Sequence, residues 1–321
     1  MFMSMFNLFR SLLSLFVLLF LLFFISSCAS NQEKSRMREG DNRGQETGMS
    51  VADEKRMTAE TLTEIQKDYP VVKNESVQQY VRAIGAKLVH ASGLEGNPYH
   101  YTFTAVEAPY VNAFALPAGT IFITAPLMKL AESEAELAGV IGHEIGHVVA
   151  RHTAERIDKA EKEKGKNILQ NIGGGVLGGI AGLGLGKLLC KDGDTECMLK
   201  AIGGGAVVGV GGTLLVQKYH FMANSREDEM ESDRIGFRIA VKAGYSKEHL
   251  GRFYEKLLEM EKQNRGKKPS GLMALLSDAM STHPPSEERV KQMHELSVAA
   301  PAQASPIISS KKFEETKQRL P

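Results

Sequence analysis

The feature that most constrains the fold is the stretch at residues 134–156, EAELAGVIGHEIGHVVARHTAER. Its apolar residues recur every three or four positions and no proline interrupts them, which predicts a helix. Two histidines, His143 and His147, are four residues apart at its centre. Because residues i and i+4 lie on one face of a helix, both imidazoles can bind the same metal ion.

Glu144 follows the first of these histidines directly. At that position its carboxylate can take a proton from an attacking water molecule without itself binding the metal. Zinc suits this HExxH pattern, because it lowers the pKa of water towards about 7. The pattern therefore favours one zinc ion at a site where water attacks a carbonyl group. The alternative is a buried helix whose two histidines only make hydrogen bonds.

Two histidines leave a zinc site one protein ligand short. A metzincin would have Gly at position 150 and His at position 153, whereas this chain has Ala150 and Thr153. His152 is one residue out of register and is expected to point elsewhere on the helix. The metzincin class is therefore rejected.

A later acidic segment offers the missing ligand. Residues 224–240 are acidic at the start and apolar towards the end, as in a helix that enters a core. Glu229 and Asp233 are four residues apart and share a face of that helix. One of them can bind zinc while the other orients an imidazole. Without the upstream histidines, these residues would be interpreted as a solvated acidic face.

Residues 1–28 are predicted to be a targeting signal rather than part of the fold. Residues 11–25 are apolar but short for a membrane span. Two serines and Cys28 follow, which resembles a bacterial lipobox, so Cys28 is expected to carry a lipid anchor. Ser30 favours the outer membrane by resemblance to bacterial sorting rules, and residues 29–50 are predicted to form a flexible tether on the periplasmic side. The alternative is an uncleaved membrane anchor.

A glycine-rich region at residues 173–212 lies within the predicted domain at residues 51–298. We predict a hairpin of two closely packed helices built from small residues. Cys190 and Cys197 flank its polar turn, and in an exported chain they are expected to form a disulfide. Membrane insertion of the two arms is the alternative, because GxxxG spacing occurs in them.

The remaining pattern predicts a mostly helical α+β domain with a small sheet beside the HExxH helix. Residues 76–88 have the spacing of an amphipathic helix, and residues 99–106 and 120–124 have strand patterns. The apolar run at residues 111–117 contains Asn112. This run either packs in the core or forms a wall of the cleft beside the HExxH helix.

The end of the chain contains two further candidates. His283 precedes two prolines after a predicted helix at residues 271–280, and Arg289 lies in the first turn of a helix that Ser286 would cap. The simplest account places His283 on the surface. Residues 299–321 are expected to form an exposed tail.

Several of these segments resemble one known family. The zinc metallopeptidase family of HtpX and the CAAX prenyl endopeptidases shares segments similar to residues 55–296, and its lipid-anchored periplasmic branch, with BepA and LoiP, is the most similar. The resemblance is carried by HEIGH with Arg151-His152, by Ser225-Arg226 with Glu229 and Asp233, by Asn112-Ala113-Phe114-Ala115-Leu116-Pro117 and by Ser281-Thr282-His283-Pro284-Pro285.

This resemblance implies a gluzincin-like fold in which His143, His147 and Glu229 bind zinc, Asp233 supports them and Glu144 is the base. In that family the His-Pro segment returns to the active site. His283 would then either donate a hydrogen bond to the oxyanion or occupy the open zinc position in a resting state, and Arg289 is a candidate catalytic residue beside it. The long helical repeats and multiple membrane spans of some relatives are not expected here.

The resemblance implies a zinc endopeptidase that cleaves unfolded or misassembled proteins of the bacterial envelope. The first alternative is an assembly factor or chaperone-like binding module on the same fold with suppressed activity. The second is an integral membrane protease that uses the glycine-rich arms as spans. With 321 residues, a net charge of +1 and no basic cluster, the chain is not expected to bind nucleic acid. The sequence does not predict an oligomeric state.

Overall fold

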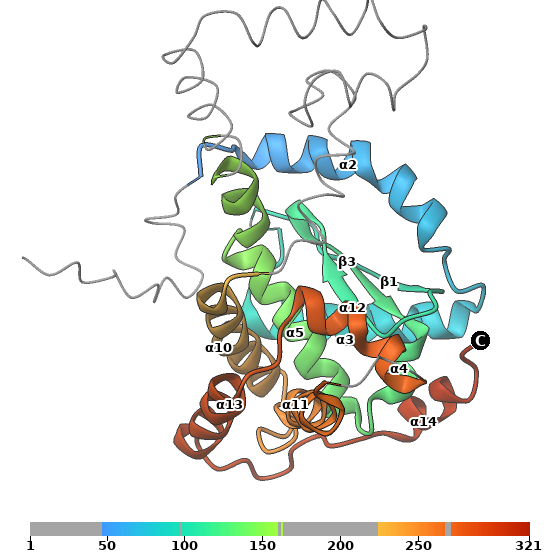
Figure 1. Cartoon of the computed structure of the whole chain (residues 1–321), viewed down its shortest axis with the longest axis vertical. Coiled ribbons are helices and arrows are strands. Elements are labelled where there is room, and N and C mark those ends of the chain that lie inside the picture. Colours follow the sequence, from blue (N-terminus) through green and yellow to red (C-terminus); the bar gives the residue numbers. More distant parts are fainter. Residues whose placement is uncertain (1–46, 97, 160–161, 163–223, 267–270) are drawn as a thin grey trace, which may run out of the picture. The chain divides into compact units, whose positions relative to one another are not determined.

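The computed structural model describes residues 47–96, 98–159, 162, 224–266 and 271–321, and their arrangement is shown in Figure 1. The fold is mostly helical α+β, as predicted. Its strands are β1 (Thr102–Val106), β2 (Ala113–Ala115) and β3 (Thr120–Thr124). Its helices are α2 (Val51–Asp68), α3 (Glu75–Ser92), α4 (Ala125–Leu130), α5 (Glu134–Val149), α10 (Arg226–Lys242), α11 (Arg252–Asn264), α12 (Leu272–Thr282), α13 (Glu287–Ala299) and α14 (Lys311–Lys317).

The three strands form one sheet in the order β1-β3-β2. β1 is parallel to β3, and β2 is antiparallel to β3 with Phe114 opposite Phe122. The predicted strand at residues 120–124 coincides with β3, whereas β1 begins only at Thr102. The apolar run at residues 111–117 contains a third strand that the sequence did not indicate. This strand, β2, lies at an edge of the sheet.

Helix α5 lies between the sheet and α10 (Figure 1). Ser133 caps its N-terminus by accepting a hydrogen bond from the backbone of Glu136. Every residue from Glu134 to Val148 is buried, so the helix has no polar face towards solvent. Such a helix is held by packing on all sides, which fixes the direction of each of its side chains.

The contact between α5 and α10 depends on glycines. A Cβ atom on Gly236 would lie 2.6 Å from the backbone nitrogen of His143 and 2.7 Å from the carbonyl carbon of Gly142. A Cβ on Gly146 would lie 2.7 Å from the hydroxyl of Ser232, which donates a hydrogen bond to the carbonyl of His143 over 2.6 Å. The absence of these Cβ atoms lets the two backbones approach, and this approach brings the acidic residues of α10 to the histidines of α5.

Helix α5 ends earlier than the sequence predicted. It stops at Val149, and Arg151 has a φ of +57°, in the left-handed region. The guanidinium of Arg151 donates hydrogen bonds to the Glu54 carboxylate from Nε at 2.7 Å and to the carbonyl of Met49 from Nη2 at 2.6 Å. These contacts hold an unfavourable backbone conformation in place. A separate helical segment then begins at residue 152 and continues to residue 159.

The C-terminal segment, predicted to be an exposed tail, has many exposed residues but packs against the domain at several positions. Ile307 forms a parallel β-bridge with Tyr245, and α14 packs its Phe313 ring, which is 1% exposed, near the ring of Tyr80 on α3. The apolar positions in this segment are few and widely spaced. Their burial therefore depends on a surface made by other elements, which no local periodicity reveals.

Other predictions fall partly or wholly outside the described residues. Cys28, Cys190, Cys197 and the glycine-rich region at residues 173–212 lie there, and so does most of the predicted tether. The last tether residues are described, and Ser50 forms a capping box with Asp53 at the start of α2.

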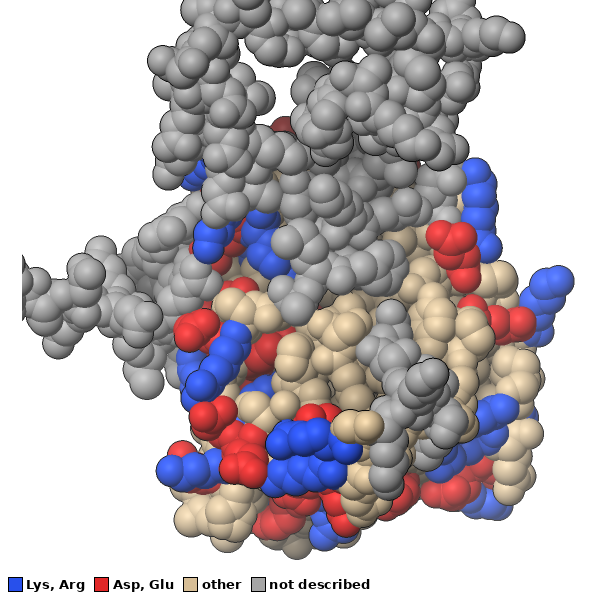
Figure 2. Space-filling view, in the orientation of Figure 1, with Lys and Arg blue, Asp and Glu red and all other residues tan. Residues whose placement is uncertain are grey.

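On the face displayed in Figure 2, acidic and basic side chains of the described residues are interspersed, so neither sign dominates it. Within the described ranges, no helix combines the length and the apolar character needed to cross a bilayer.

The glycine contact gives a direct test. We expect Gly236→Ala to reduce the free energy of unfolding by about 1–3 kcal/mol, because the added methyl group meets backbone atoms that cannot rotate away. Urea denaturation of the wild-type and variant chains measures this difference. Gly48→Ala is the matched control, since a Cβ there makes only an ordinary contact with Asp158 at 3.5 Å. Equal stability of the two variants would contradict the packing argument.

Candidate metal centre and active-site cleft

Helices α5 and α10 bring three predicted ligands together. The Nε2 atoms of His143 and His147 are 2.9 Å apart. One carboxylate oxygen of Glu229 is 3.3 Å from the His147 Nε2 atom, and the other is 3.4 Å from the His143 Nε2 atom. Four ligands at about 2.0–2.1 Å in a tetrahedron are separated from each other by about 3.3 Å, so this spacing fits one zinc ion.

The protonation of these groups also fits a bound cation. Burial and the neighbouring His143 hold the pKa of His147 well below its ordinary value, which keeps this imidazole neutral. For His143, burial acts to lower the pKa, but the charges of Glu229 and Asp233 raise it to about 9. The negative charge that attracts a proton to this position would also attract a metal ion, which requires the neutral imidazole.

Asp233 and Arg289 lie behind the ligands. Oδ1 of Asp233 is 2.8 Å from Nδ1 of His143, so it faces the ring nitrogen opposite the metal side. Arg289 binds both oxygens of Asp233 at 2.7 and 2.8 Å, and its Nη1 lies 2.7 Å from Oε2 of Glu229. Its guanidinium also lies 4.5 Å from the centre of the Tyr254 ring. These contacts fix the orientation of two of the three ligands.

Arg289, predicted as a candidate catalytic residue, is 1% exposed and is not among the residues that line the cleft. Burial acts to raise the pKa of Asp233, but the positive charge of Arg289 holds it below its ordinary value. The contacts of Arg289 therefore favour the ionised form of this buried carboxylate.

His152 is a member of the site that the sequence interpretation missed. Its Nδ1 atom is 2.8 Å from Nδ1 of His147, and its Nε2 atom is 3.3 Å from Oε2 of Glu231. This chain of contacts holds the His147 ring with Nε2 towards the other ligands. On an uninterrupted helix His152 would point away, but the left-handed conformation of Arg151 turns it back. The Arg-His pair directly after HEIGH was the available signal.

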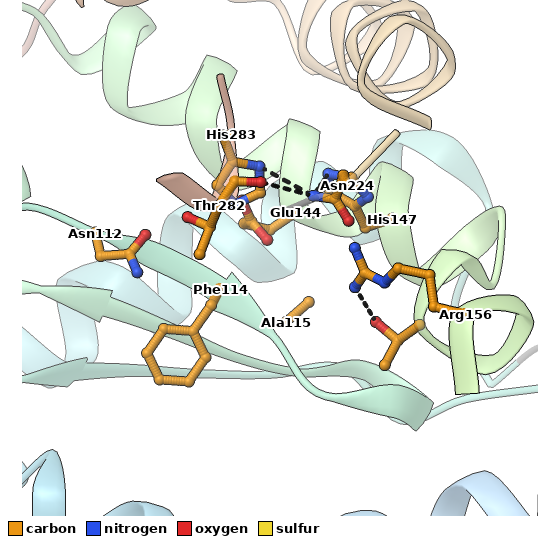
Figure 3. Close-up of a pocket in the computed structure, with 10 residues that line it drawn as sticks. Asn112, Phe114, Ala115, Glu144, His147, Arg156, Asn224, Thr282 and His283 are labelled. Carbon is orange, nitrogen blue, oxygen red and sulfur yellow. Dashed lines mark hydrogen bonds and ion pairs between the residues drawn. The ribbon is translucent and has the colours of Figure 1, made fainter. Parts of the chain in front are cut away.

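A cleft opens beside the ligands, and Figure 3 shows the residues that line it. Glu144 lies in this cleft, and burial raises the pKa of its carboxyl group. Asn112 lines the same cleft next to Phe114 and Ala115 of β2. The run at residues 111–117 thus fits both predicted alternatives, because part of it lines the cleft and its apolar side chains are buried in the core.

His283 returns to the ligand cluster from the end of α12. Its Nδ1 atom lies 3.0 Å from Oε1 of Glu229 and 3.3 Å from Nε2 of His143. Its Nε2 atom lies 3.5 Å from the carboxylate of Glu144. Four donor atoms, one each from His143, His147, Glu229 and His283, lie within 4.8 Å of one another. The surface location of His283 is therefore excluded.

Asn224 closes the other side of this cluster, and the sequence interpretation did not single it out. Its side-chain amide donates a hydrogen bond to Oε1 of Glu229 over 2.6 Å. Its backbone nitrogen and its side chain both donate to the carbonyl of Thr282 over 3.3 Å. Asn224 thus ties the start of α10 to the segment that carries His283.

The HExxH helix and the donors around it define a metallopeptidase-type centre. The chain belongs to peptidase family M48, whose profile matches residues 75–297. The beta-barrel assembly-enhancing protease of Escherichia coli K12 is 24% identical over 242 residues, 75% of this chain and 43% of that protein. A putative protein of the same name from Vibrio cholerae is 27% identical over 231 residues, 72% of this chain and 41% of that protein.

Eukaryotic relatives are similar over a comparable share of the chain. The mitochondrial metalloendopeptidase OMA1 of Arabidopsis thaliana is 29% identical over 241 residues, 74% of this chain and 40% of that protein. The chain thus matches about two fifths of the length of these relatives. The family resemblance predicted from the separated motifs is confirmed.

The pairing of Arg289 leads to a stability prediction. We expect Arg289→Met to lower the free energy of unfolding by about 3–5 kcal/mol, because it leaves the buried carboxylates of Asp233 and Glu229 without their cation. Urea denaturation in the presence of a chelator measures this loss without a contribution from metal binding. Arg56→Met, on the exposed face of α2, should change stability by less than about 0.5 kcal/mol. A loss for Arg289→Met as small as that of Arg56→Met would refute the role given to this arginine.

Proposed function

We propose that the chain is a zinc-dependent metalloendopeptidase in which His143, His147 and Glu229 hold the metal and Glu144 is the general base. The observation that carries the proposal is the convergence of these three donors at 2.9–3.4 Å beside a cleft that is lined by the carboxylate of Glu144. Bound zinc would supply Lewis acidity that polarises the scissile carbonyl.

The side chains of the chain divide the remaining work. Glu144 takes a proton from the attacking water and returns it to the leaving amine. Its raised pKa suits both steps, because a base that is too weak accepts the proton poorly and an acid that is too weak returns it poorly. Asp233 and His152 hold the two ligand imidazoles in place, so little reorganisation is needed during the reaction.

The edge strand β2 offers a surface for an extended substrate. Thr124 donates its backbone hydrogen bond to Asn112 over 3.0 Å, and Phe114 lies opposite Phe122. In an antiparallel ladder the intervening residues, Ala113 and Ala115, direct their backbone groups to the other side. We infer that a peptide binds there as a further strand, which places one of its bonds beside Glu144.

We infer that the substrates are unfolded or misassembled proteins of the bacterial envelope. Support comes from the N-terminal lipobox and from the printed names of the bacterial relatives, which describe beta-barrel assembly-enhancing proteases. In this proposal Cys28 carries the lipid that anchors the chain to the outer membrane, and Cys190 and Cys197 form a disulfide in the oxidising periplasm. Unfolded chains suit this proposal, because an extended peptide segment can add to the edge of β2.

Two substitutions separate metal binding from chemistry. Glu229→Ala should lose zinc at moderate chelator concentrations, because the site then has one fewer ligand and one fewer negative charge. Glu144→Gln should retain zinc and lose hydrolysis of casein, because the amide cannot accept the proton. Zinc content by mass spectrometry and casein cleavage, with and without chelator, are the measurements. Full zinc content together with normal activity in Glu229→Ala would disprove the ligand assignment.

His283 is proposed to restrain the enzyme by occupying the open metal position at rest. Its Nδ1 atom lies among the donor atoms, where it competes with water and substrate. We expect His283→Ala to raise casein cleavage with zinc retained. If His283 instead donates to the oxyanion, the same change should lower kcat by about 10²-fold. His294→Ala, at an exposed position of α13, is the control and should behave as wild type.

A further inference from the structure

Arg156 lies in the cleft with an incomplete set of partners. Its Nη2 atom donates a hydrogen bond to Thr153 Oγ1 over 3.1 Å. Its Nε and Nη1 atoms are buried and have no hydrogen-bond partner, and no carboxylate of the described residues forms an ion pair with it. Figure 3 shows the guanidinium directed into the space between His147 and Ala115.

Two other arginines near the predicted ligands, Arg289 and Arg151, form ion pairs with carboxylates of the chain. Arg289 pairs with Asp233 and Glu229, and Arg151 pairs with Glu54. A buried guanidinium without a carboxylate is costly, since it has lost water and gained no ion pair. Burial accordingly holds the pKa of Arg156 below its ordinary value, although the group remains charged at neutral pH. Its position in the cleft makes a ligand the natural source of the missing acceptor.

The position of Arg156 along the cleft indicates which part of a substrate it meets. In Figure 3, Asn112 lies at one end of the row of lining residues, Ala115 lies near the middle, and Arg156 lies at the other end. β2 runs from Ala113 to Ala115. A peptide paired antiparallel to β2 therefore has the residues N-terminal to its scissile bond near Ala115. A terminal carboxylate would be at the opposite end.

We propose that Arg156 forms a specificity subsite for the carboxylate of an acidic side chain, on the N-terminal side of the scissile bond. Nη1 offers unused N–H donors to an oxygen of this carboxylate, and Nε–H, on a different edge of the planar guanidinium, can donate to a second acceptor. Thr153 orients the group through Nη2. This inference rests on the proposed peptidase function and adds a preference among its substrates.

The test uses quenched fluorescent peptides that share one cleavable sequence and contain a single Glu or Gln, placed in turn on either side of the scissile bond. At one position on the N-terminal side of the scissile bond, the full-length chain should cleave the Glu peptide faster than the matching Gln peptide. The kcat/KM for the Glu peptide should be about 10-fold or more above that for the Gln peptide. In Arg156→Gln, the ratio of kcat/KM for the Glu peptide to kcat/KM for the Gln peptide, measured within that variant, should fall to about 1. Arg156→Lys should restore part of it.

A second readout does not depend on turnover. In a Glu144→Gln background, the preferred Glu peptide should bind with a lower Kd than the Gln peptide, and adding Arg156→Gln should equalise the two values. Arg56→Gln is the matched control for loss of one positive charge, and it should leave the ratio unchanged. Zinc content and thermal unfolding of each variant check that the site is intact.

The outcomes separate the two proposals. Cleavage of Glu and Gln peptides at equal rates, with equal Kd values, would overturn the Arg156 subsite and leave the peptidase function standing. If Arg156→Gln lowers the cleavage rates of the Glu and Gln peptides by the same factor, Arg156 maintains the general integrity of the site. This result would also overturn the proposed subsite. If the chain prefers a peptide with a free C-terminus over the same peptide with an amidated C-terminus, the ligand of Arg156 is a terminal carboxylate, and the acidic-side-chain subsite is overturned. No cleavage of any peptide by the wild-type or His283→Ala chains would instead refute the proposed function.

Discussion

The close approach of α5 and α10 is the contact on which the rest of the site depends. Metal ligands must be placed to within a few tenths of an ångström, and here they come from residues more than eighty positions apart in the chain. Gly142 and Gly236 set the distance between the two helices, because at each position the backbone of the other helix occupies the space that a Cβ would need. Once that distance is fixed, the i,i+4 periodicity of each helix brings two histidines opposite two carboxylates.

This arrangement concentrates negative charge in a buried region, and the chain balances it with the buried guanidinium of Arg289. Asp233 and Glu229 share Arg289, whose fork geometry fixes their orientation as well as their ionisation. A lysine would offer the charge without that geometry. The distribution of arginines is therefore informative in itself. Those that meet carboxylates within the chain support the site, and Arg156, which meets none, faces the space that a substrate would enter.

Local patterns predicted what depends on periodicity and missed what depends on tertiary contacts. Glu229 and Asp233 were identified as a pair because they are four residues apart in one helix. β2 has three residues, Ala113–Ala115, which is too short for a strand pattern. His152 was misplaced because helical periodicity alone does not show that Arg151 leaves the helical conformation. The position of Arg289 depends on partners about sixty residues earlier in the sequence, so its place behind the ligands could not be derived from spacing.

The contacts of Arg151 also join the segment ahead of α2 to the candidate metal site. Met49 and Glu54 bind this arginine, and Thr47 donates a hydrogen bond to the carbonyl of Ala154 over 3.3 Å. Residues 47–54 are thus fastened on both sides of His152. A displacement of these residues would be transmitted to the turn that holds His152 against His147. The segment before α2 and the geometry of the histidine cluster are in this way connected through a single left-handed residue.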